Sequence, residues 1–197
     1  MEKISKNILT SLWEEKIKLA QYVINTTAEF TIPQLGYTIP GDNWTVYSHL
    51  HHIVWIDRMM RFSVPFSILA SSLFPFKSLG EPDYALELEK VSRLYQTPSI
   101  PPGLGEIYVF KASTLNLTGV KTQKLIQLYS KWKASLQIAE NYLLKLSEED
   151  CRKKRFFSAV GVYSLPAGIE LHVAHTTHYL HNNILPALSN SEFLEKK

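Results

Sequence analysis

The feature that most constrains the fold of this chain is a set of four long stretches whose apolar residues recur at helical spacing. They cover roughly residues 3–29, 44–63, 121–147 and 165–189. Each stretch carries one apolar face, which must be buried against another element. A chain of 197 residues, 45% of them hydrophobic and 20% charged, suits a single core of that kind. The sequence therefore predicts an all-α fold, a four-helix bundle formed by one domain over residues 1–197.

The connection between the second and third stretches, residues 64–120, is too long for a simple loop in a compact domain. Within it, "PDYALELEKVSRLY" predicts a short helix, whereas "TPSIPPGLGEIY" is rich in proline and predicts irregular structure. We therefore expect a long crossover between helices two and three, which could cover the mouth of the bundle and set substrate selectivity. Asn43 is the expected N-cap of the second helix, and Pro65 is expected to end it.

The segment 151–164, "CRKKRFFSAVGVYS", connects the last two helices, and its Phe, Val and Tyr content is compatible with a short hairpin. Ser164 is a candidate N-cap for the last helix, and Pro166 suits the first turn of that helix. Pro186 is expected to bend or end the helix.

The composition favours a cytoplasmic protein without a membrane or nucleic-acid partner. The chain has one cysteine, Cys151, so an internal disulfide is impossible, which fits a reducing compartment. The charged N-terminus has no apolar signal region, and no run of 18 apolar residues occurs. The net charge of +3 is too small to indicate nucleic-acid binding, and the "RKKR" run is interpreted as a solvated turn.

All seven histidines fall in two windows, "HLHH" at 49–52 and "ELHVAHTTHYLHNN" at 170–183. A helical wheel of the second stretch places His52 near the middle of the apolar arc and His49 towards one side. The same wheel places His51 and Asp57 on the wet face. On the last stretch, His181 lies near the centre of the apolar arc, His178 towards its edge, His175 at the margin and His172 outside it.

Three imidazoles in an apolar interior each need a partner for their ring nitrogens. A single divalent cation would satisfy all three, and neutral imidazole is a good ligand for zinc, nickel and iron. The sequence therefore predicts a metal site formed by His52, His178 and His181, with His175 and His49 as reserves. Three protein ligands leave open positions, as in catalytic rather than structural sites.

Other metal and nucleophile chemistries have less support. A di-iron centre needs several inward carboxylates, and the two helices offer only Asp57 and Glu170. The "HExxH" motif is absent, and nothing places a histidine beside Cys151, which is interpreted as an ordinary thiol.

The order and spacing of these elements resemble the DinB/YfiT-like superfamily of metal-dependent hydrolases over nearly the whole chain. "NWTVYSHLHHIVWID" resembles the family's second helix, in which a tryptophan precedes the ligand histidine by eight residues, as Trp44 precedes His52. "LHVAHTTHYLHNNIL" resembles the last helix, which carries two ligand histidines at i and i+4. Here successive histidines are three residues apart, so no two of them occupy i and i+4, and the register is open. The i, i+4 pair of positions could be Thr177 and His181, His178 and Asn182, or His175 and Tyr179.

The resemblance implies zinc or nickel in an open three-histidine site, a small-molecule substrate such as a low-molecular-weight thiol, and a homodimer. The first hypothesis is an enzyme that activates water or a thiol, for which Glu170 is the only general base suggested. The second is a non-catalytic binding or interaction protein whose histidines are hydrogen-bonded. The third is a cofactor such as haem held between the helices, although Trp44, Trp55 and Phe62 are expected to fill the necessary space.

Overall fold

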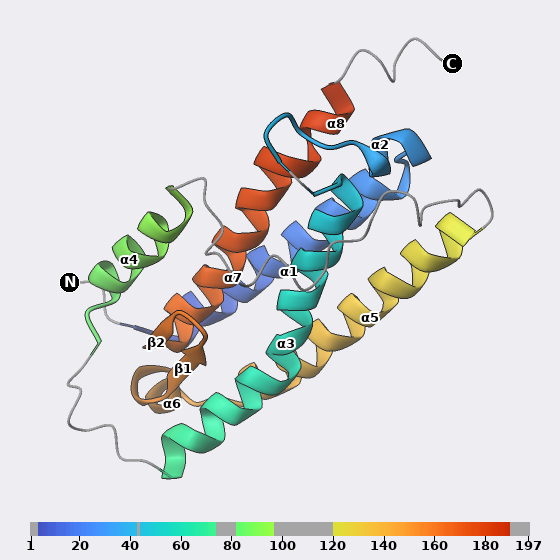
Figure 1. The fold of residues 1–197 in the computed structure, drawn as a ribbon. Helices are drawn as coiled ribbons and strands as arrows, with labels where there is room; N and C mark the ends of the chain where they lie inside the picture. The colour runs from blue at the N-terminus through green and yellow to red at the C-terminus, as the bar shows by residue number, and fades with distance from the viewer. Residues whose placement is uncertain (1–3, 43, 74–81, 97–119, 190–197) are drawn as a thin grey trace.

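The computed structural model describes residues 4–42, 44–73, 82–96 and 120–189, and they are mainly helical, with one small antiparallel sheet (Figure 1). This confirms the helical class expected from the sequence. None of the described helices is long and apolar enough to cross a membrane. The elements in chain order are α1 (Lys6–Ala28), α2 (Ile32–Gly36), α3 (Val46–Leu73), α4 (Tyr84–Gln96), α5 (Val120–Leu143), α6 (Glu148–Lys153), β1 (Arg155–Ser158), β2 (Gly161–Ser164), α7 (Leu165–Tyr179), the π-helix η4 (Leu180–Ile184) and α8 (Pro186–Ser189).

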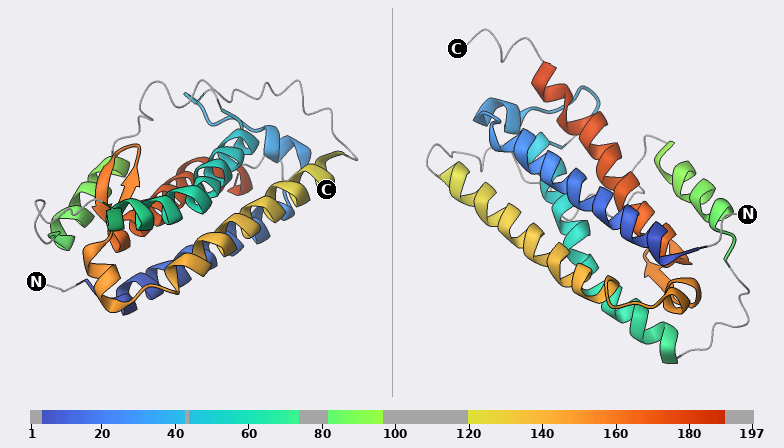
Figure 2. Two further views of the ribbon diagram at one scale, coloured as in Figure 1. Left: turned by 90° about the horizontal axis from the view of Figure 1, so that it is seen from below. Right: turned by 180° about the vertical axis from the view of Figure 1, so that it is seen from behind.

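The four long helices lie in two layers. α3 packs along α5, and α1 packs along α7. Seen from below, α1 and α5 form one layer, and α3 and α7 form the other (Figure 2). The side chains between the helices include Val23, Leu50, Ile53, Trp132 and Ile169, all of them fully buried.

The prediction that Pro65 ends the second helix is wrong, because α3 continues through Pro65 to Leu73. Proline removes one helical hydrogen bond, and packing beyond it can compensate for that loss. The added turns pack against β1. In this contact Ser67 Oγ accepts a hydrogen bond from the backbone N–H of Phe157 at 3.0 Å, and Ser71 Oγ accepts one from Arg155 at 2.9 Å.

The expected hairpin in 151–164 is present as β1 and β2, paired from Arg155↔Ser164 to Ser158↔Gly161. The expected cap is present as well, since Ser164 Oγ accepts from the N–H of Ala167 at 3.4 Å. Ser164 also binds α4, because its N–H donates to Glu87 Oε1 at 3.0 Å. Glu87 therefore fixes α4 beside the start of α7.

α4 confirms the short helix predicted from "PDYALELEKVSRLY". The Pro-rich segment "TPSIPPGLGEIY" and the expected N-cap Asn43 lie outside the described residues. At the start of α3, Thr45 Oγ1 accepts from the N–H of Ser48 at 3.2 Å, which caps the first turn.

The centre of the molecule contains a buried ionic group, which overturns the placement of Asp57 on the wet face. Asp57 is fully buried and accepts from Lys16 Nζ at 2.6 Å, Trp132 Nε1 at 2.9 Å and His172 Nδ1 at 3.1 Å. Lys16, also fully buried, donates to Thr176 Oγ1 at 2.5 Å and to the carbonyl of His172 at 2.9 Å. These five residues, here called the Asp57 cluster, come from all four long helices. The two charges in the cluster, on Lys16 and Asp57, are paired with each other.

Candidate functional site

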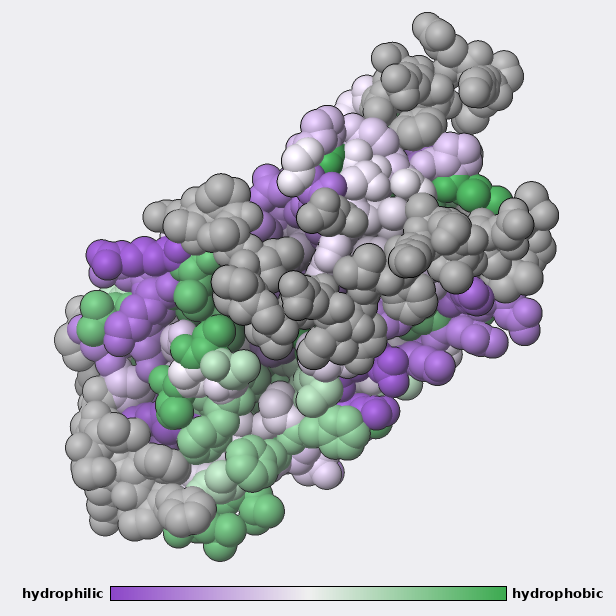
Figure 3. Space-filling view, in the orientation of Figure 1, coloured by the Kyte–Doolittle hydropathy of each residue, from purple (hydrophilic) through white to green (hydrophobic). Residues whose placement is uncertain are grey.

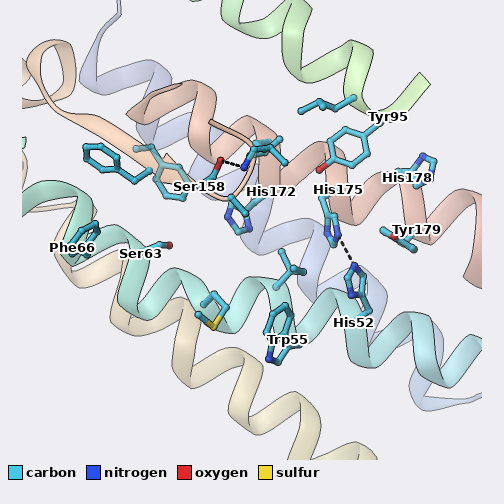
Figure 4. Close-up of a pocket in the computed structure, with 18 residues that line it drawn as sticks. His52, Trp55, Ser63, Phe66, Tyr95, Ser158, His172, His175, His178 and Tyr179 are labelled. Carbon is cyan, nitrogen blue, oxygen red and sulfur yellow. Dashed lines mark hydrogen bonds between the residues drawn. The ribbon is translucent and has the colours of Figure 1, made fainter. Parts of the chain in front are cut away.

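A pocket of about 510 Å³ lies between α3, α4, α7 and the β1–β2 hairpin. Figure 4 shows its lining drawn as sticks, with His52, Trp55, Ser63 and Phe66 on α3 and His172, His175, His178 and Tyr179 on α7. The remaining lining is chiefly apolar and includes Ile56, Met59, Leu94, Phe156, Phe157 and Leu171.

The mouth of the pocket is apolar and open to solvent. Met59, Phe66, Leu94 and Val160 line it, yet they remain 43%, 60%, 41% and 45% exposed. On the face shown in Figure 3, apolar side chains gather over the hairpin, α4 and the C-terminal half of α3. The apolar arc predicted for the second helix was expected to face a closed core. Part of this arc instead faces the open pocket.

At one end of the pocket, His52 on α3 meets His175 on α7, with their Nε2 atoms 3.3 Å apart (Figure 4). Both rings are buried. Burial, together with the smaller effects of neighbouring His49 and His51, lowers the pKa of His52 to about 4. Burial also lowers the pKa of His175 well below its ordinary range. At neutral pH both imidazoles are therefore uncharged, and their contact is a hydrogen bond between neutral rings.

The unpartnered nitrogen of this pair indicates where the shared hydrogen lies. His175 Nδ1 is buried and has no hydrogen-bond partner among the described residues. A buried N–H without an acceptor costs about 1–3 kcal/mol, so the favoured tautomer carries its hydrogen on Nε2 and donates to His52 Nε2.

Tyr179 packs against both members of the pair. The centroid of its ring lies 4.9 Å from that of His175 and 5.1 Å from that of His52. Burial raises the pKa of Tyr179 to about 12, so the phenol stays protonated at neutral pH. Of the three registers left open by the sequence, the structure therefore brings the His175–Tyr179 pair to His52.

The other two predicted ligands do not meet His52 in the same way. His178 lies at the edge of the pocket, partly exposed, and its Nδ1 accepts from Asn182 Nδ2 at 3.1 Å. His181 is exposed, which overturns its placement at the centre of the apolar arc. His49, a reserve ligand, instead donates from Nε2 to Asp42 Oδ2 at 2.7 Å.

Helix geometry accounts for the different directions of these side chains. Each step of three residues turns a side chain back by about 60°, so histidines at 172, 175, 178 and 181 sweep about half a turn. The sweep begins inside, where His172 binds Asp57, and ends in solvent at His181. The wheel predicted the opposite order because it included residues beyond η4. There the N–H of Leu185 bonds to the carbonyl of Leu180, a π-type i+5 bond that shifts the phase of the helix.

The pocket fits two metal ligands rather than the three that the family resemblance implies. Two nitrogens bound to one tetrahedral zinc at about 2.0–2.1 Å lie about 3.3–3.4 Å apart, and the Nε2 atoms of His52 and His175 have that spacing. In the part of the chain that the structure describes, however, no group of three His, Cys, Asp or Glu side chains could hold one ion. Within the described ranges, His175 Nδ1 also has no acceptor of the kind that a metal-bound imidazole ordinarily has on its second nitrogen.

The remaining candidates lie elsewhere. Cys151 is fully buried, and burial raises the pKa of its thiol, as expected for an unreactive cysteine. Burial raises the pKa of Glu170 too, but this side chain is not part of the pocket lining. Among the described residues, Glu170 therefore lies outside the set that lines the pocket.

Comparisons with known proteins add no relative: no family model matches the chain, and neither a curated protein nor a solved structure matches it significantly.

Proposed function

We propose that this protein binds a small, mainly apolar molecule in the pocket, with a polar group of that molecule at the His52–His175 pair. The observation that carries the proposal is the pocket itself. Its volume of about 510 Å³ falls within the range of about 300–1,000 Å³ typical of small-molecule sites. Such sites combine apolar walls with a few convergent polar groups, and here those groups are uncharged imidazoles.

The four-helix bundle and the DinB/YfiT-like relationship remain part of this proposal. Two observations support them: the layered packing of α1, α3, α5 and α7, and the position of His52 and His175 on the second and last long helices. The family's second imidazole at i+4 is replaced by Tyr179, a protonated phenol, so this chain is expected to use the pocket without the complete metal site.

The pocket can be tested with nitrobenzene as an apolar probe, read by quenching of Trp55 fluorescence and compared with Trp55→Phe. Ser63 lines the pocket, and its buried Oγ has no hydrogen-bond partner among the described residues. Ser63→Phe should therefore fill the space without removing a hydrogen bond, and we expect it to weaken nitrobenzene binding about tenfold or more, because about 1.4 kcal/mol of apolar contact corresponds to a factor of ten.

The matched control is Ile126→Phe, which adds a ring at a position on α5 that is 60% exposed and remote from the pocket. It should leave nitrobenzene binding unchanged. Equal affinity of the native protein, Ser63→Phe and Ile126→Phe would contradict binding in this pocket.

The second candidate function is a metal-dependent enzyme, a hydrolase or thiol-dependent transferase, with His52 and His175 as the protein ligands. The specific observation in its favour is the 3.3 Å spacing of their Nε2 atoms. A bound divalent cation supplies a lowered pKa for water or a thiol and so a nucleophile near neutral pH. The neutral state of both imidazoles suits metal binding, because only the unprotonated nitrogen is a ligand.

Calorimetric titration of the tag-free protein with zinc and nickel tests this candidate. If the pair binds metal, His52→Ala and His175→Ala should each lower the affinity at least tenfold, because one of two ligands is lost. His181→Ala should leave the affinity unchanged, because His181 is exposed and lies on a different face of the helix from His175. No binding by the native protein, or equal binding by all variants, would leave only the first candidate.

A further inference from the structure

His172 joins the buried Asp57 cluster to the wall of the pocket. Its Nδ1 lies 3.1 Å from Asp57 Oδ1, and its ring lines the pocket one turn of α7 before His175 (Figure 4). The ring of Phe156 packs edge-on against it, with centroids 5.7 Å apart. Among the described residues Nε2 has no hydrogen-bond partner, so this nitrogen is left for a ligand.

The ionisation of Asp57 fixes which nitrogen of His172 carries the hydrogen. Lys16 and His172 hold the pKa of Asp57 at about 2 despite its burial, so the carboxylate is ionised and can only accept. Nδ1 of His172 must therefore carry a hydrogen and donate it to Asp57. Lys16 is the counter-ion of Asp57, and the His172 tautomer that donates from Nδ1 has its lone pair on Nε2, the ring nitrogen that does not contact Asp57.

We infer that His172 is a second polar group of the pocket, which accepts a hydrogen bond through Nε2 from a hydroxyl or thiol of the bound molecule, with Asp57 as its positioning residue. The inference rests on the proposed function in one respect, that the pocket binds a ligand. It narrows the ligand class to a small apolar molecule that carries an O–H or S–H group. A proton passed from that group to Nε2 would leave the ligand as an anion and His172 as an imidazolium still bonded to Asp57.

The Asp57 cluster has two possible roles: it positions His172 for a ligand, or it only specifies the fold. The tautomer of His172 distinguishes between these roles. Nitrogen-15 NMR of histidine-labelled protein at pH 7 should show Nε2 of His172 without hydrogen and Nδ1 with it. In Asp57→Asn the amide oxygen is held by the two donors Lys16 and Trp132, so the amide NH₂ faces Nδ1 of His172. The tautomer should therefore reverse, with the hydrogen on Nε2.

Asp57→Asn leaves Lys16 without its counter-ion and could unfold the protein. The double variant Lys16→Met/Asp57→Asn removes both charges together, which buried pairs tolerate far better, and should show the same reversed tautomer. His172→Phe keeps an apolar ring in the pocket wall but removes the acceptor.

Binding is then compared for nitrobenzene and 3-nitrophenol, which differ by one hydroxyl and are both neutral at pH 7. The native protein should bind 3-nitrophenol about fivefold more tightly, the factor that corresponds to one ordinary hydrogen bond. His172→Phe should bind both about equally, and the signal of His172 Nε2 should move when 3-nitrophenol is added to the native protein.

A native His172 that carries its hydrogen on Nε2, or a preference for 3-nitrophenol that survives in His172→Phe, would overturn the inference. Failure of the native protein to bind nitrobenzene would instead contradict the proposed binding function, and the tautomer measurement would still decide the role assigned to Asp57.

Discussion

At the scale of single residues, burial keeps the pocket imidazoles uncharged, and this makes stability depend on pH. The pKa of His52 is about 4 in the folded protein, below the ordinary value of about 6.5. Between these values the unfolded chain binds more protons than the folded one, so the free energy of unfolding falls as the pH falls from about 6.5 to about 4. His175, His49 and His51 shift in the same direction.

We therefore expect urea denaturation to give a smaller free energy of unfolding at pH 5 than at pH 7. His52→Phe should reduce that difference, because one of the groups responsible is gone. Asp57 does not interfere, since its pKa of about 2 makes its contribution fall only below about pH 4. Equal stability at the two pH values would show that these imidazoles are not held neutral by burial.

Residue-scale prediction from the sequence succeeded for His52 and failed for Asp57. His52 lies on the buried side of α3, as the wheel predicts. The helical wheel places Asp57 opposite the apolar arc, whereas in the structure it is buried with its partner Lys16, which lies on another helix. Nothing local in either stretch indicates that the two charges meet. The positions of Tyr179 and His172 were missed for the same reason, because each depends on how α7 is rotated against α3.

At the scale of elements, the contact between α7 and β1 leaves no room for a side chain at Gly168. A Cβ at this position would lie 2.3 Å from Cγ and 2.5 Å from Cβ of Phe156, which is buried and also lines the pocket. These atoms lie near the backbone and cannot swing away. We expect Gly168→Ala to destabilise the protein by about 1–3 kcal/mol, measured by thermal or urea unfolding.

The control is Gly36→Ala, at a position where a Cβ would meet nothing within 4 Å. Its stability should stay within about 0.5 kcal/mol of the native protein. If Gly168→Ala is equally harmless, the hairpin does not pack against α7 as described.

The elements themselves were largely predictable, because periodicity marks long helices well and their ends poorly. α1, α5 and α7 start and end within a few residues of expectation, apart from the replacement of the last turns by η4 and α8. The extension of α3 past Pro65 was missed because it depends on Ser67 and Ser71 binding β1, a contact distant in sequence. The π-turn has no signature in apolar spacing. A helical wheel assumes a regular α-helix, so it placed His181 on the apolar face although this residue is exposed.

At the scale of the whole molecule, the Asp57 cluster links all four long helices. Its two charges, on Lys16 and Asp57, should be strongly coupled because both are fully buried and in direct contact. Lys16→Met or Asp57→Asn alone leaves one buried charge without its partner, and we expect each to cost about 3–5 kcal/mol. The double variant should cost clearly less than the sum, as measured by a urea-unfolding double-mutant cycle.

The exposed ion pair between Arg93 and Glu89 on α4 is the matched control, for which the same cycle should give about 0–0.5 kcal/mol. Additive costs for Lys16 and Asp57 would mean that the buried pair is not formed in solution.

The pocket has walls of two kinds, and this has a consequence for how such a protein can diverge. α3 and α7 belong to the layers that hold the Asp57 cluster, whereas the hairpin and α4 contribute side chains from outside those layers. Exchanging Val160 or Leu94 would reshape the cavity without touching the ion pair on which cohesion depends. The shape of the outer pocket wall and the buried ion pair are thus encoded in separate segments, and a lineage built on this scaffold is free to change the first while preserving the second.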